Sequence, residues 1–148
     1  MSVLHLARLS CFLSVAMLFA SAAQAMQIQQ FDKMAGSDQD EYIAELIQGA
    51  EKVLTDEGQA DQSAQVSTLF RTKDAGDQIS IGMTEFYRNL ARARLADVKR
   101  AANDPNARRI QVEDALAVTL KKNSIALPAA FFTVANGFQP KLPMASKN

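Results

Sequence analysis

The apolar residues of this chain recur at helical spacing over most of its length. The clearest segment is residues 42–54, where apolar side chains lie at i, i+3, i+4 and i+7: Tyr42, Ile43, Leu46, Ile47, Ala50, Val53 and Leu54. At about 100° per residue these positions share one sector of a helix, and none of them is charged. Ser37 is suited to cap this helix, acidic residues occupy its first turn, and residues 56–58 (DEG) end it. We therefore expect an amphipathic helix between Ser37 and Gly58.

Three further helices follow from the same spacing. A weaker one is expected over residues 61–73, a long one begins at Ser80 and runs to about residue 102, and a third covers residues 112–122. The sequence NDPN at residues 103–106 breaks the long helix, because proline disfavours a helical residue before it. Its predicted inner face, flanked by Phe86, consists of Met83, Tyr87, Leu90, Ala91, Val98 and Ala101.

Both ends of the helical region carry shorter apolar segments. Residues 27–35 place Ile28, Phe31 and Met34 at a spacing of three, which indicates a short helical lead-in. Residues 127–128 (LP) start a last short helix that contains Phe131 and Phe132 and is closed by residues 136–137 (NG). Residues 138–148 then read as an extended tail. Without strand-like alternation, fixed repeats or a linker, the pattern predicts an all-α fold, a single small bundle of four to five short helices.

The first 25 residues have the pattern of an export signal. A weakly positive start with His5 and Arg8 precedes the uncharged apolar residues 11–20, and Ala23 and Ala25 form the A-x-A arrangement that signal peptidase recognises. The apolar run is too short to span a bilayer, which needs about 20 apolar residues. We therefore expect cleavage after Ala25 and a periplasmic or secreted protein without a stable membrane anchor. The mature part, residues 26–148, is then a single helical domain with residues 26–36 as its lead-in.

Removing this signal excludes most familiar catalytic chemistry. The 148-residue chain has no Trp, and its only Cys and His, Cys11 and His5, both lie in the signal. The mature chain then has no disulfide, no Cys-His or Ser-His-Asp system, no thiolate zinc site and no covalently attached haem. A glycine-rich phosphate loop is also missing, and the residues after 104–106 (DPN) do not supply a calcium loop. We expect no metal, no cofactor and no catalytic residue.

Two other functions stay open on the sequence alone. A pair of carboxylates is enough for acid-base hydrolysis, and sixteen acidic residues make close pairs common. A small-ligand carrier would use an apolar pocket lined by Phe131, Phe132 and Phe138.

The net charge of zero conceals two oppositely charged halves. Residues 26–85 hold twelve acids and four bases, a net charge of −8, whereas residues 86–148 hold four acids and eleven bases, a net charge of +7. The acidic and basic helices either pack together and cancel this field, or they leave charged faces that steer a protein partner or drive self-association. Nucleic acid is not expected, because the whole mature chain is nearly neutral and is exported.

Four cations of the long helix are the candidate binding residues. Arg94 falls within the predicted apolar face, so its guanidinium must reach solvent, pair with Glu45 or Glu113, or bind an anion at the mouth of a pocket. Arg88, Arg92 and Lys99 lie on the opposite side as a basic contact surface. We therefore expect a non-enzymatic exported module that binds another protein.

The mature chain also resembles a group of small, uncharacterised, exported helical proteins of bacteria. The similarity rests on residues 82–86 (GMTEF), 89–94 (NLARAR), 104–108 (DPNAR), 112–116 (VEDAL) and 142–143 (LP). It implies a helical exported protein and no activity. Residues 42–43 (YI), Pro105 and residues 115–116 (AL) are similar to features of periplasmic immunity proteins of type VI secretion systems. Those proteins carry paired cysteines that this chain lacks, so no functional residue is transferred from them.

Overall fold

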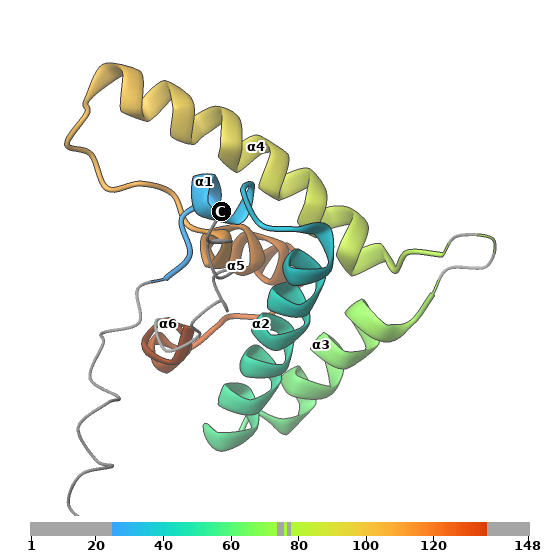
Figure 1. Ribbon diagram of the computed structural model, residues 1–148. Helices are drawn as coiled ribbons and strands as arrows, with labels where there is room; N and C mark the ends of the chain where they lie inside the picture. Colours follow the sequence, from blue (N-terminus) through green and yellow to red (C-terminus); the bar gives the residue numbers. More distant parts are fainter. Residues whose placement is uncertain (1–24, 74–75, 77, 136–148) are drawn as a thin grey trace, which may run out of the picture.

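The computed structural model describes residues 25–73, 76 and 78–135, which form six α-helices (Figure 1). These are α1 (Ile28–Phe31), α2 (Gly36–Asp56), α3 (Ala60–Arg71), α4 (Ile81–Asn103), α5 (Val112–Lys122) and α6 (Ala129–Ala135). The expected small all-α bundle is confirmed. The predicted lead-in is the single-turn α1, and the predicted helix over residues 112–122 has the same bounds as α5.

The core forms around α2, which packs against α3 and α6, while α4 packs against α5 and α3. In Figure 1, α2 and α3 run side by side and α4 crosses one end of the bundle above α5. All seven apolar residues predicted for the first amphipathic helix are buried, with Ala50 and Leu54 fully enclosed. Phe31, Phe86 and Phe131 are the largest fully buried side chains, and they bring α1, α4 and α6 onto the same core.

The predicted Ser37 cap is wrong, because α2 begins at Gly36, two residues earlier than a cap at Ser37 allows. Ala35 occupies the N-cap position, and its carbonyl oxygen accepts hydrogen bonds from the backbone N–H groups of Asp38 and Gln39. The Gln39 side chain donates to the Phe31 carbonyl oxygen at 2.8 Å and so joins α1 to the start of α2. The predicted end is confirmed: α2 stops at Asp56, and Gly58 has the positive φ of 77° that glycine tolerates.

The predicted inner face of α4 is partly wrong. Ser80 caps the helix as expected by accepting the Met83 N–H at 3.2 Å, but the buried residues are Gly82, Phe86, Asn89, Leu90 and Asp97. Tyr87 and Val98, predicted to face inward, are 39% and 64% exposed. The face is rotated because Asn89 and Asp97 find polar partners on neighbouring segments and can therefore be buried at low cost.

A short antiparallel contact joins the beginning of the described chain to the segment before α5. Gln27 and Gln111 form an isolated β-bridge, with Val112 N–H donating to the Met26 carbonyl oxygen at 3.0 Å. The Ile28 N–H donates to the Ile110 carbonyl oxygen at 3.3 Å. Residues 26–28 are thereby fixed beside the connection that leads from α4 to α5.

Several predictions concern residues outside the described ranges. These are the signal with Ala23, the helix end at residues 136–137 and the tail at residues 138–148, including Phe138. Among the helices that are described, none is long and apolar enough to cross a bilayer.

The contact between α3 and α4 depends on Gly82. A Cβ atom at this position would lie 2.6 Å from the Leu69 carbonyl oxygen and 2.7 Å from Leu69 Cγ. We predict that Gly82→Ala lowers the free energy of unfolding by about 1–3 kcal/mol, because the two helices must separate. Gly36→Ala is the matched control, since a Cβ there has no atom within 4 Å. Urea unfolding of both variants tests this, and equal stability of the two would contradict the close approach.

Candidate functional site

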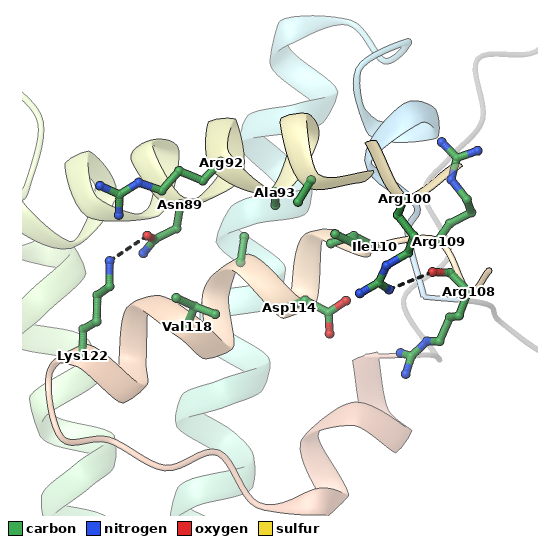
Figure 2. A pocket seen from close by; sticks show the side chains of 12 residues that line it. Asn89, Arg92, Ala93, Arg100, Arg108, Arg109, Ile110, Asp114, Val118 and Lys122 are labelled. Carbon is green, nitrogen blue, oxygen red and sulfur yellow. Dashed lines mark hydrogen bonds between the residues drawn. The ribbon is translucent and has the colours of Figure 1, made fainter. Parts of the chain in front are cut away.

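A groove of about 590 Å³ lies between α4 and α5 and is the main candidate site (Figure 2). It is lined by Asn89, Arg92, Ala93, Ala96, Arg100, Arg108, Arg109, Ile110, Asp114, Ala115, Val118 and Lys122. Small apolar side chains from both helices and from Ile110 form one part of this lining. The rest of the lining is polar and consists of Asn89, the acid Asp114 and five cations: Arg92, Arg100, Arg108, Arg109 and Lys122.

The cations occupy both ends of the groove. Arg92 and Lys122 lie at one end in Figure 2, whereas Arg100, Arg108 and Arg109 gather at the other, with Val118 and Asp114 between them on α5. Val118 is 47% exposed, so an apolar surface is open to a ligand between two positively charged ends.

Hydrogen bonds hold several of these side chains in place. Lys122 Nζ donates to Asn89 Oδ1 at 2.9 Å, and the buried Asn89 side chain in turn donates to Thr119 Oγ1 at 2.9 Å. At the other end, Arg100 donates to the Arg108 carbonyl oxygen at 3.0 Å. Cations that are already ordered lose little conformational freedom when a ligand binds.

Asp97 fixes the segment that carries Arg108 and Arg109. Its carboxylate, with a side chain only 3% exposed, accepts two hydrogen bonds from Nε of Arg109 and one from Nη2, the last at 2.6 Å. It also accepts the Ile110 N–H at 2.8 Å. The hydrogen bonds from Arg109, joined by that from Ile110, hold the pKa of Asp97 below its ordinary value despite the opposing effect of burial.

Most of the groove's positive charge is not neutralised by the described residues. Within these residues Arg109 pairs with Asp97, but Arg92, Arg100, Arg108 and Lys122 have no carboxylate within 4.0 Å. Asp114, the one acid in the lining, accepts the Gln111 N–H at 3.0 Å and so caps α5. The groove therefore presents excess positive charge to solvent.

The predicted binding residues divide between different surfaces. Arg92 lines the groove, whereas Arg88 and Lys99 are exposed on α4 but do not line it. Arg94 lies elsewhere and forms a bidentate ion pair with Asp32, with Nη2 to Oδ1 at 2.6 Å.

The predicted partners of Arg94 were wrong. Glu45 is exposed and Glu113 is engaged with Tyr42, while the lead-in brings Asp32 to Arg94 instead. The Arg94 side chain is 40% exposed, because α4 is rotated relative to the predicted face. Asp32 was not considered as a partner, because the prediction for the lead-in used only the spacing of its apolar residues.

The sequence pattern did not single out four residues of the groove: Arg100, Arg108, Arg109 and Lys122. One available signal was the series Arg92, Ala96 and Arg100, which puts two guanidinium groups on one stripe of α4 with a small residue between them. The position of residues 108–110 beside α4 could not be predicted from helical spacing, because it depends on the long-range contact with Asp97.

A second, smaller hollow of about 320 Å³ lies near the beginning of the described chain. It is lined by Ala25, Arg108, Gln111, Glu113, Asp114 and Phe132. Phe131, one of the residues predicted to line a carrier pocket, is fully buried in the core, and Phe132 is 37% exposed. This hollow is largely polar where it meets α5.

Comparison with known proteins adds no assignment to this geometry. Neither protein families, nor curated proteins, nor solved structures include one that matches the chain. Where the structure is described, no three His, Cys, Asp or Glu side chains are grouped so that they could hold a metal ion.

The two bidentate Asp–Arg pairs differ in burial, which gives a matched test of the Asp97 contact. We predict that Asp97→Asn lowers the free energy of unfolding by about 2 kcal/mol, because the buried Arg109 and Ile110 contacts lose their charged acceptor. Asp32→Asn is expected to cost less than about 1 kcal/mol, since its side chain is 38% exposed. Equal losses in urea unfolding would show that Asp97 does not organise its segment.

The ion pair of Asp97 should make the free energy of unfolding depend on pH in the acidic range. Its pKa is depressed in the folded protein, so its stabilisation is present at neutral pH and is lost as pH falls through the folded-state value. Unfolding free energies measured between pH 7 and acidic pH should therefore fall more steeply for the parent protein than for Asp97→Asn. Parallel pH profiles would contradict this assignment.

Proposed function

We propose that the chain is an exported, non-enzymatic module, cut after Ala25, that binds an acidic segment of another protein in the groove between α4 and α5. The observation that carries this proposal is the combination of four cations without ion-pair partners among the described residues and an apolar strip between them.

Charge complementarity favours a negatively charged partner. A carboxylate-bearing segment gains Coulomb attraction from Arg92 and Lys122 at one end and from Arg100 and Arg108 at the other. These cations lie on α4, on α5 and on the segment between them, and this spread suits an extended ligand with several negative charges. Attraction of this kind raises the rate of encounter and falls with added salt.

The apolar strip favours a polypeptide as the partner. Ala93, Ala96 and Val118 offer no hydrogen-bonding groups, so a small anion would leave this part of the groove uncovered. A protein segment in which small apolar residues separate Asp and Glu would cover the strip and reach both charged ends. We therefore propose a polypeptide as the ligand rather than a free anion.

Site-specific crosslinking tests the occupant of the groove directly. A photoreactive amino acid is placed at Val118 in the full-length chain, which is produced in its natural host and irradiated at low salt. We expect crosslinks to a different protein, at a segment in which Asp and Glu outnumber Lys and Arg. The control position is Leu95, which is 75% exposed on α4 and does not line the groove.

Two outcomes would contradict the proposal. One is crosslinking from Val118 only to a second copy of the chain, which would make the groove a site of self-association. The other is an equal yield of the same products from Leu95, which would show that the contacts are nonspecific.

Charge reversal gives a quantitative prediction for the captured partner. Arg92→Glu combined with Arg100→Glu should weaken its binding at least tenfold, or about 1.4 kcal/mol, because both ends of the groove then repel carboxylates. Arg88→Glu combined with Lys99→Glu makes the same change in net charge on the same helix but outside the groove. Titration calorimetry of both double variants tests this, and equal losses would mean that only overall charge matters.

A further inference from the structure

Residue 26 is held in position by contacts that do not involve its own nitrogen. Its carbonyl oxygen accepts the Val112 N–H at 3.0 Å, and the following bridge joins Gln27 to Gln111. The side chains of Met26 and Ile28 belong to the core, with 3% and 2% of their surface exposed. The location of the Met26 nitrogen is thus set by backbone pairing and by apolar packing.

A buried carboxylate lies beside this nitrogen. Met26 N is 3.3 Å from Glu113 Oε1, and the Tyr42 hydroxyl donates to the same oxygen. Glu113 is only 1% exposed, and its second oxygen, Oε2, is buried without a hydrogen-bond partner. The ion pairs of the described residues do not include Glu113. A buried carboxylate in this condition is costly unless a cation and further donors reach it.

Burial shifts the pKa values of both Glu113 and Tyr42. Burial raises the pKa of Glu113 above its ordinary value, and the hydrogen bonds from Tyr42 and the backbone only partly oppose that effect. Burial, together with the neighbouring Glu113, also raises the pKa of Tyr42, so Tyr42 remains a hydroxyl donor. A cation beside Glu113 would favour its charged form and oppose the effect of burial.

We propose that Glu113 and Tyr42 form a binding site for the α-ammonium group of Met26, which exists only after the chain is cut following Ala25. The proposal rests on the export step of the proposed function and not on the groove. Export cleavage hydrolyses the Ala25–Met26 peptide bond: water supplies the new carboxylate of the leaving fragment, and the freed amine takes up a proton. The single amide N–H beside Glu113 becomes a cation with three N–H donors.

The surroundings have room for this change. Ala25 lines the smaller hollow together with Glu113, so its departure leaves the new amino terminus beside that space. The other charged groups around the cluster are Arg108 and Asp114, which line the hollow, and Glu45 on α2. Cleavage also removes Ala25, which is only 5% exposed, so the effect of the pairing is best measured between two chains that have both lost this residue.

The test compares two full-length chains that the same bacterial host exports and matures. One is the natural chain, and the other carries Ser-Gly inserted between Ala25 and Met26, so that residue 26 keeps an ordinary amide. Each is made with and without Glu113→Gln, which retains the side-chain shape but removes its negative charge. The mass of each purified product identifies its first residue.

We expect the inserted chain to have an unfolding equilibrium constant at least tenfold larger than that of the natural chain. In the Glu113→Gln background the insertion should change this constant less than twofold, because Arg108, Asp114 and Glu45 are common to all four chains. Such a double-variant comparison isolates the contribution of the ammonium–carboxylate pair.

The pH dependence separates the ion pair from a packing effect of the insertion. Pairing with Glu113 raises the pKa of the α-amino group in the folded state, so the advantage of the natural chain is present below the ordinary α-amino pKa. It is lost as pH rises through the raised value. This readout needs only the two chains that retain Glu113.

Two results would overturn the inference, and they have different meanings. A matured protein that begins at Met26 but is no more stable than the inserted chain, or whose advantage does not change with pH, rules out the ammonium site alone. A matured protein that begins at another residue rules out the site together with the proposed cleavage, while the crosslinking test of the groove is unaffected.

Discussion

The groove between α4 and α5 and the site beside Met26 both depend on the hydrogen bonds that the buried carboxylate of Asp97 accepts. From the last turns of α4 it holds Arg109 through its guanidinium and Ile110 through its backbone N–H. These bonds turn the chain back toward the bundle after α4 ends at Asn103. One side of the returning segment then carries Arg108 and Arg109 at the groove. The carbonyl oxygen of Ile110 accepts the Ile28 N–H and so joins this segment to the start of α1.

The polar groups inside this bundle are concentrated along one path. Asn89, Asp97, Glu113 and Thr119 are buried on α4 and α5, whereas the buried residues of α2 and α3 are apolar apart from Tyr42 and Gly49. Asn89 donates to Thr119 and accepts from Lys122, and Asp97 accepts from Arg109 and Ile110. Glu113 retains one unpartnered oxygen, and the proposed α-ammonium would supply its missing charge. Burying polar groups costs desolvation free energy. In the proposals made here, these buried groups position the cations of the groove and bind the new amino terminus.

Much of the fold was predictable from the spacing of apolar residues, but the sites were less so. The helix containing residues 42–54 and the one over residues 112–122 carry clear apolar patterns and acidic residues in their first turns, and both helices are confirmed. The face of α4 was misplaced because the prediction rested on apolar residues alone, whereas long-range partners allow Asn89 and Asp97 to be buried. Arg92 was found as an exposed cation of one helix. The groove itself needs residues 108–110, whose position depends on a contact spanning a non-helical segment.

The central claim is that Asp97 holds residues 108–112 as a fixed part of the bundle. Amide hydrogen exchange of the protein tests this claim most directly, because it reports the opening of individual hydrogen bonds. The account predicts that the N–H groups of Ile110, Val112 and Ile28 exchange as slowly as those in the middle of α5. Exchange of these three amides at the rate of an open loop, while α5 stays protected, would contradict it.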